Sequence, residues 1–363
     1  MTQDDQKKAK TRLTYRTIWR WHFYAGLFCI PFVIWLSITG GIYLFKSEIE
    51  SWLDRPYDQL QGNHPQMKGD DLIRAATQSV PGSVFMAYEL PQSDHSAVRI
   101  LVSTDEYLYR VYVHPQTGRI LNSIREDQRP MRQLFYLHGE LAWGDKGSMI
   151  VELAASWAVI MILSGLYLWW PRQTEKLAGV FWPRLNGSNR IFWRDLHAVT
   201  GVWVSIFALF LLFSGLPWAK SWGVYLKTIR KITNTVNGPQ DWTTGRSSEV
   251  AEQKAMKKRV EAVSHQHHGM HPLPEMNLAA IDRMIATVQP LGLAHPVLIS
   301  PPQTANGPWT AKSDAPNRTL RAELTLDPNT GAILQRVNFN QRHWIDRAVG
   351  VGVAAHEGQL FGF

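Results

Sequence analysis

The sequence predicts an α-helical transmembrane bundle, with three complete spans and the start of a fourth, that carries two α+β domains outside the membrane. Three observations predict this fold class: long apolar segments, basic residues that flank them, and motifs that occur once in each half of the chain. The apolar segments are Trp21–Phe45, Leu153–Trp170 and Leu196–Trp218. Since a bilayer core about 30 Å thick takes roughly 20 helical residues to cross, each segment is long enough to be a span.

The first span carries a titratable side chain. Trp21–Phe45 contains no Lys, Arg, Asp or Glu, but His22 lies near its start. An ionisable group in a span is costly and marks a functional site by default, so His22 is a candidate site residue. No short apolar region with a cleavage site precedes this segment, which predicts a retained anchor.

The net charge of +8 is distributed unevenly along the chain. Basic residues precede the first span and separate the second from the third: Lys7, Lys8, Lys10, Arg12, Arg16, Arg20, Arg172, Lys176, Arg184, Arg190 and Arg194. By the positive-inside rule these two segments are cytoplasmic, so the charge indicates topology in a lipid bilayer and no nucleic-acid partner.

This topology divides the chain into eight segments. They are a cytoplasmic tail (1–17), a first span (18–45), an external domain (46–137), an outer-face histidine segment with the second span (138–171), a cytoplasmic loop (172–193), a third span (194–218), a second external domain (219–345), and an outer-face histidine segment that starts a fourth span (346–363).

Both external regions contain helix and strand patterns. Helix patterns occur at Asp71–Val80, Glu249–Val263 and Asn277–Val288, and strand patterns at Val98–Val102, Tyr107–Val113 and Arg321–Leu326. A Pro-x-Thr-Gly sequence follows the last strand pattern of each region, at Pro115–Gly118 and Pro328–Gly331. Proline and glycine in these positions, between apolar runs, predict hairpin turns.

Three sets of matches indicate an internal duplication. The motif H-x-x-x-G occurs at His22–Gly26 and His197–Gly201, and in each span a Thr/Ser–Gly pair follows seventeen residues after the histidine. The motif P-x-T-G-x-I-L occurs twice, and H-G-E-L-A-W-G at His138 matches H-E-G-Q-L-F-G at His356. Because a complete span follows His138, the matches predict a fourth span after His356, where seven residues remain.

The four histidines fall into two pairs at two depths. His22 and His197 begin outward-going helices near the cytoplasmic face, whereas His138 and His356 precede inward-going spans near the outer face. Seventeen helical residues separate the two levels by roughly 20 Å. Haem iron accepts axial imidazoles from opposite sides, as two facing helices can supply. We therefore expect two bis-histidine haems, one at each level.

Two glycines support the inner haem site. Gly26 and Gly201 each lie four residues after a histidine, on the same helix face, where they leave room for a flat macrocycle. A six-coordinate iron has no open position, which suits electron transfer. The alternative is that each histidine only makes an interhelical hydrogen bond.

Other candidates are less specific. The histidines of the loop at 265–271 could bind Zn²⁺, Cu²⁺ or iron as a second metal site, or could be solvated: His265, His267, His268 and His271. Carboxylates near the outer level could orient an imidazole, relay a proton or cap a helix: Glu140, Glu152 and Glu357. The single cysteine, Cys29, excludes an intrachain disulfide and is expected to pack in the first span. No nucleotide-binding glycine motif follows a strand pattern.

The longer motifs are W-H-x-x-x-G at Trp21, L-H-x-x-x-G at Leu196, L-H-G-E at Leu137, S-G-L-Y-L-W-W at Ser164 and A-H-E-G-x-L-F-G at Ala355. Together with the Pro-x-Thr-Gly turns, they resemble the PepSY-associated transmembrane (PepSY_TM) family of bacterial inner-membrane proteins. The resemblance implies PepSY-like α+β domains in the periplasm. It also implies b-type haem and, as in the ferrisiderophore reductases of the family, reduction of siderophore-bound Fe(III).

Two functions of different classes follow. The first is a di-haem inner-membrane oxidoreductase that takes electrons from a cytoplasmic reductase or membrane quinol and reduces a periplasmic Fe(III)–siderophore. The second is a non-enzymatic anchor whose PepSY-like domains bind a periplasmic peptide, protease or envelope partner. Metal delivery through the 265–271 loop is a third hypothesis.

Overall fold

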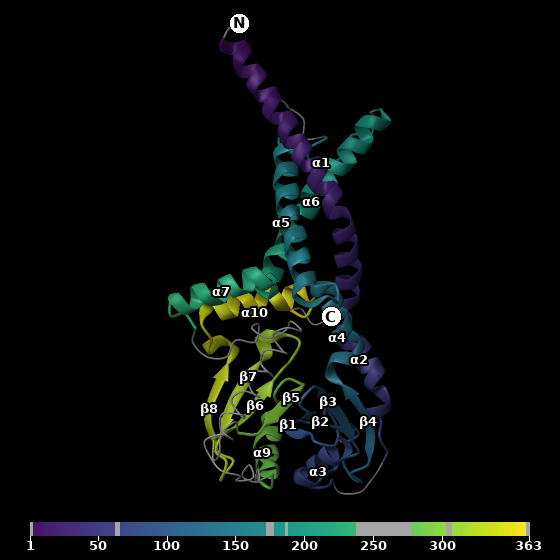
Figure 1. The fold of residues 1–363 in the computed structure, drawn as a ribbon, viewed down its shortest axis with the longest axis vertical. Helices are drawn as coiled ribbons and strands as arrows, with labels where there is room; N and C mark the ends of the chain where they lie inside the picture. Colours follow the sequence, from purple (N-terminus) through teal and green to yellow (C-terminus); the bar gives the residue numbers. More distant parts are fainter. Residues whose placement is uncertain are drawn as a thin grey trace. The chain divides into compact units, whose positions relative to one another are not determined.

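The computed structural model describes residues 3–61, 66–171, 178–185, 188–236, 278–302 and 307–360, with side chains from residue 14 onward. The chain forms two compact units, whose elements are labelled in Figure 1. The helical unit comprises Met1–Thr39 and His138–Thr228, and the sheet unit comprises Gly40–Leu137 and Ile229–Phe363. We describe each by itself.

The helical unit contains the three predicted spans. Helix α1 (Gln3–Tyr43), α5 (Gly144–Trp169) and α6 (Asn189–Gly215) contain the segments long and apolar enough to cross a bilayer: Thr14–Tyr43, Gly144–Trp169 and, through the short helix η3 (Leu216–Trp218), Asn189–Trp218. Many of their large apolar side chains are exposed, as expected for helices whose solvent is lipid. Helix α7 (Lys220–Ile232) follows η3 after Ala219. The last four residues of α1 and the last four of α7 belong to the sheet unit.

The sheet unit is built around one eight-stranded antiparallel sheet. Its strands are β1 (Val84–Glu89), β2 (Val98–Ser103), β3 (Leu108–Val113), β4 (Ile120–Arg125), β5 (Val297–Ser300), β6 (Trp309–Ser313), β7 (Ala322–Leu326) and β8 (Ile333–Asn338). The spatial order is β4-β3-β2-β1-β5-β6-β7-β8. Its helices are α2 (Lys46–Asp54), α3 (Gly69–Ser79), α4 (Pro130–Glu140), whose last three residues belong to the helical unit, α9 (Ala280–Val288) and α10 (Trp344–His356), with short helices η1 (Arg55–Tyr57), η2 (Glu126–Gln128), η4 (Gln289–Leu291), η5 (Arg318–Leu320) and η6 (Phe339–Gln341).

The central pairing of this sheet corrects the prediction of two external domains. Strand β1 of the first region pairs with β5 of the second, with Tyr88 opposite Ile299 and Glu89 opposite Leu298. Each region contributes a helix followed by four consecutive strands, which is the order a duplication would give. The halves therefore form one unit because their inner strands complete each other's hydrogen bonding, which leaves no inner edge exposed.

One face of the sheet carries a shared hydrophobic core. Alternate strand residues such as Val98, Ile100 and Ile299 are fully buried there, as the two-residue period of a strand requires. Helices α3 and α9 contribute the other side of the core, and the Gly69 N–H of α3 donates to Asp282 Oδ1 of α9 at 2.6 Å. A single core therefore serves both halves.

Most of the predicted elements in the described residues are present. The expected helices at Asp71–Val80 and Asn277–Val288 correspond to α3 and α9, and the expected strands to β2, β3 and β7. Both Pro-x-Thr-Gly sequences form hairpin turns in which the glycine has a left-handed backbone, with φ of +67° at Gly118 and +74° at Gly331. The expected helix at Glu249–Val263 lies outside the described residues.

The fourth span stays a prediction. Helix α10 ends at His356 and a turn follows, with Gly358 at φ +71°. The described residues end at 360, before the point at which the first half begins its span after the corresponding turn.

Candidate functional site

The structure brings His22 and His197 together. His22 lies on α1 and His197 on α6, and their ring centroids are 6.1 Å apart with an angle of 66° between the ring planes. A nitrogen that ligates a transition metal lies about 2 Å from it, with the ring centre about 1 Å further, so two imidazoles on opposite sides of one ion have centroids about 6 Å apart. The observed spacing matches this arrangement.

One ring nitrogen of His22 is already engaged. Its Nδ1 lies 3.0 Å from the carbonyl oxygen of Met161 on α5. Since a carbonyl only accepts, the proton of the neutral ring sits on Nδ1 and the lone pair on Nε2. In the described part of the chain, neither His22 Nε2 nor His197 has a hydrogen-bond partner. Metal-bound histidines in proteins show this same arrangement, with the second nitrogen donating to a carbonyl.

The glycines beside these histidines leave space. A Cβ built at Gly201 would meet nothing within 4 Å, and one at Gly26 only the sulfur of Met161 at 3.8 Å. Gly165 on α5 is different, because its Cβ would lie 2.8 Å from Cε1 of His22. The helix faces next to His22 and His197 therefore fit a flat macrocycle, while the α5 face fixes the His22 ring.

His138 lies at the end of α4 and contacts α1. Its Nδ1 is 2.8 Å from the hydroxyl of the buried Thr39. His356, the last residue of α10, is half-buried and belongs to the sheet unit. The pairing of His138 with His356 therefore stays a prediction. The histidines at 265–271 lie outside the described residues.

The predicted carboxylates have different surroundings. Glu152 accepts hydrogen bonds from the backbone N–H groups of Ser221 and Trp222 at 3.1 and 2.9 Å, so it caps the start of α7, one of the roles expected for it. Glu140 is buried. Its backbone carbonyl oxygen lies so close to Gly147 that a Cβ there would be only 1.6 Å away, so position 147 requires glycine. Glu357 lies 3.9 Å from Arg318.

The remaining expectations concern packing. Cys29 is buried and its Sγ lies 3.7 Å from the carbonyl oxygen of Ala154 on α5, which confirms the expected packing role.

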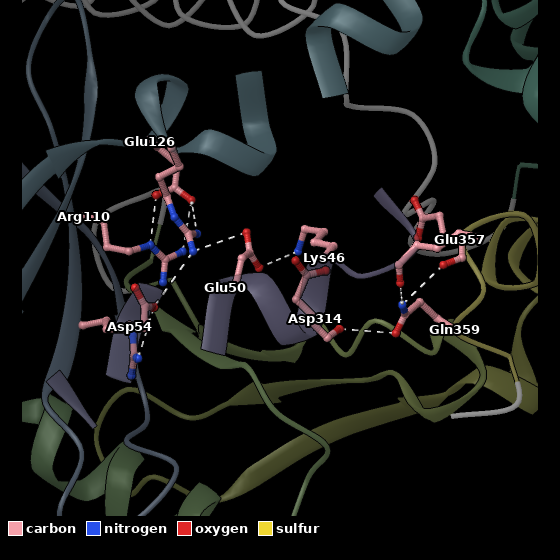
Figure 2. Close-up of polar contacts among 12 residues, drawn as sticks. Lys46, Glu50, Asp54, Arg110, Glu126, Asp314, Glu357 and Gln359 are labelled. Atoms are coloured by element: carbon pink, nitrogen blue, oxygen red, sulfur yellow. Dashed lines mark hydrogen bonds and ion pairs between the residues drawn. The ribbon is translucent and has the colours of Figure 1, made fainter. Parts of the chain in front are cut away.

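A network of ion pairs on the second face of the sheet escaped the sequence reasoning (Figure 2). Helix α2 directs Glu50 and Asp54 toward arginines of the sheet and of the segment before α4. Asp54 accepts from the Tyr112 hydroxyl at 2.9 Å and from Arg99 at 3.2 Å. The sequence signal for this network is an arginine inside each of two apolar strand patterns, Arg99 and Arg110. An arginine that becomes buried in a strand requires a partner of opposite charge.

Arg110 is the centre of this network. It pairs with the buried Glu89 and donates two hydrogen bonds to Glu126, at 2.9 and 3.1 Å. Burial alone would raise the pKa of Glu126, but Arg110 and Arg129 outweigh it and lower that pKa to about 2. The network therefore stabilises α2 against the sheet and leaves few charges for chemistry.

Comparison with protein families matches the description "PepSY-associated TM region" over residues 19–363. No curated protein matches the chain. The family match begins just before His22 and includes the three spans and the eight-stranded sheet. Because it covers nearly the whole sequence, the chain belongs to the PepSY-associated transmembrane family.

Proposed function

We propose that this chain is a di-haem oxidoreductase of the bacterial inner membrane that carries electrons across the bilayer and reduces an Fe(III)–siderophore in the periplasm. The observation that supports it most is the approach of His22 and His197 at a centroid distance of 6.1 Å within the membrane helices. Two imidazoles inside a span need a compensating partner, and an iron between them supplies one.

The residues of the inner site have separate roles in this proposal. His22 and His197 would hold the iron of a haem b from α1 and α6, and Gly26 and Gly201 would leave room for its ring. A haem with two axial histidines supplies one-electron transfer without binding oxygen. His138 and His356 would hold a second haem near the periplasmic face.

The electron donor is a membrane quinol or a cytoplasmic reductase, and the acceptor is ferric iron held by hard oxygen ligands. One electron from the chain converts Fe(III) to Fe(II), which those ligands hold less firmly, so the iron is released. The resemblance of the sequence to ferrisiderophore reductases supports this choice of acceptor.

The test is haem content. The purified wild-type chain should show a Soret band and contain two haems b, and His22→Ala and His197→Ala should each contain one. His95→Ala is the matched control, because His95 is an exposed histidine of the sheet unit that contacts the Leu60 carbonyl oxygen, and it should keep both haems. A colourless wild-type protein would contradict the proposal, as would full haem content in both inner variants.

The sheet supports a second candidate function, binding of an extended peptide. Strand β8 is an outer strand of the sheet, and four of its six residues, Ile333 to Arg336, are exposed. An open edge of this kind can add a further strand by main-chain hydrogen bonding. This function predicts a colourless protein in which the membrane histidines are dispensable.

A further inference from the structure

Two Ser/Thr–Gly pairs at the ends of spans contact candidate ligand histidines on other helices. Thr39, which precedes Gly40 on α1, has its hydroxyl 2.8 Å from Nδ1 of His138. Ser164, which precedes Gly165 on α5, has its hydroxyl 3.4 Å from Nδ1 of His22, and Gly165 lies against the same ring. The four residues in contact, Thr39, His138, Ser164 and His22, and Gly165 all belong to the helical unit.

The hydrogen bonds around His22 determine where its proton sits. The Met161 carbonyl, 3.0 Å from Nδ1, can only accept, so Nδ1 donates. The Ser164 hydroxyl donates to the Ile160 carbonyl at 2.7 Å and is 3.0 Å from the Met161 carbonyl. Gly165 has no side chain to displace the ring. Ser164 and Gly165 thus shape the surface of α5 beside the Met161 carbonyl, which accepts the hydrogen bond from Nδ1.

The bonds around His138 lead to the same assignment. The Thr39 hydroxyl has one proton, which it donates to the Trp35 carbonyl in its own helix at 2.8 Å. Its oxygen is therefore left to accept the bond from His138, so Nδ1 of His138 carries a proton too. Both rings would then present the lone pair of Nε2.

We propose, resting on the function proposed above, that Thr39 and the Ser164–Gly165 pair are positioning residues for the two histidines. Thr39 holds the proton on Nδ1 of His138, and the Ser164–Gly165 pair keeps the His22 ring where its Nδ1 proton meets the Met161 carbonyl, so that Nε2 of each ring is reserved for the iron. A metal-bound imidazole whose second nitrogen donates a hydrogen bond has a fixed orientation and a raised basicity. The pairs act on the ligands without touching the iron.

The test is histidine ¹⁵N nuclear magnetic resonance on the full chain in lipid nanodiscs, reduced so that low-spin haem iron is diamagnetic. His22→Gln and His138→Gln assign the two signals. In the wild type, both rings should show an Nδ1–H proton at a low-field, hydrogen-bonded shift. In Thr39→Val, the His138 proton should move upfield and exchange faster with water, whereas the His22 proton should not change.

Two further variants separate positioning from general damage. Thr39→Ser keeps the hydroxyl and should restore the His138 signal. Ser205→Ala removes a buried hydroxyl that donates to the Gly201 carbonyl of its own helix, at 2.6 Å, and should leave both signals unchanged. Thr39→Val should also raise the midpoint potential of one haem, because a less basic imidazole stabilises the ferric state less.

The outcomes distinguish the two proposals. An Nε2–H signal on wild-type His138, or a His138 proton unaffected by Thr39→Val, would overturn the positioning role. A colourless protein that shows Nδ1–H on both rings would overturn the proposed function and support the proton positions.

Discussion

The sheet unit and the helical unit each contain a polar cluster, and the two clusters differ in how their members are paired. In the sheet unit, the buried Glu89 and Arg99 and the half-buried Arg110 form a network in which each charge faces an opposite charge. In the helical unit, His22 and His197 approach each other, and among the described residues His22 forms hydrogen bonds through Nδ1 and none through Nε2. A densely paired network indicates a structural role, whereas a ring pair with a reserved nitrogen indicates a ligand site.

The largest expected effect on stability comes from a substitution that breaks the ion-pair network of the sheet unit. Arg110→Met leaves Glu89 and Glu126 without their central partner, and removing one member of a buried ion pair costs roughly 3–5 kcal/mol. We expect the free energy of unfolding of the sheet unit to fall by this amount, measured by fluorescence of the buried Trp309, while haem content stays at the wild-type value.

Arg125→Met is the matched control, because Arg125 pairs with Asp127 in a partly exposed position on the same unit. Its effect should be small, because an exposed ion pair contributes little to stability. Loss of haem in Arg110→Met with an intact sheet unit would show that the two kinds of polar cluster are not separate in function.

The next effect is a pH dependence. The folded-state pKa of Glu126, about 2, is below its ordinary value of 4.5. Glu126 therefore contributes stability that is fully present above about pH 4.5 and is lost as the pH falls toward 2. At pH 6, the free energy of unfolding of Glu126→Gln should be roughly 2 kcal/mol lower than that of the wild type, and this difference should shrink on acidification. Equal differences at pH 6 and pH 2 would contradict the ion-pair assignment.

A smaller effect tests the helical unit. The Cβ of Gly165→Ala would lie 2.8 Å from His22 Cε1, so the ring must shift. Displacing a ligand through its support typically costs 10–100-fold in metal affinity, so haem should dissociate faster by about 10-fold at one site. Haem transfer to an acceptor protein measures this rate. Gly41→Ala is the control, because its Cβ would meet nothing within 4 Å, and it should keep the wild-type rate.

The smallest expected effect on stability concerns Glu152, a carboxylate near the expected outer pair of histidines. Glu152 caps α7, so Glu152→Gln should destabilise the start of that helix by about 1 kcal/mol and leave the haem spectrum unchanged. Amide hydrogen exchange at Ser221 and Trp222 measures the loss. A shifted haem spectrum in this variant would instead give Glu152 a role at the haem.

The spans, the hairpin turns and the meeting of His22 with His197 could be predicted because each depends on local patterns or on a repeated spacing. Apolar length determines a span, and a glycine at φ +67° or +74° determines the turn at Gly118 or Gly331. The placement of His22 and His197 at one depth followed from the topology, in which each begins an outward-going helix near the cytoplasmic face.

The joined sheet and the ion network could not be predicted in the same way. The pairing of Tyr88 with Ile299 joins residues that are far apart in the chain, and no local pattern specifies a partner at that separation. Arg110 lies in a strand pattern that is equally typical of a strand with one face in solvent. Its partners Glu89 and Glu126 are brought to it only by the tertiary structure. Likewise, the Met161 carbonyl that orients His22 is a backbone atom without a sequence signal.

The central claim is that His22 and His197 bind the same iron. The most direct measurement is haem content in His22→Ala, His197→Ala and the double variant, purified side by side and quantified as the pyridine complex. Each single variant and the double variant should contain one haem, because the second substitution removes a ligand of a site that is already lost. A double variant with fewer haems than either single variant, or with as many as the wild type, would contradict the account.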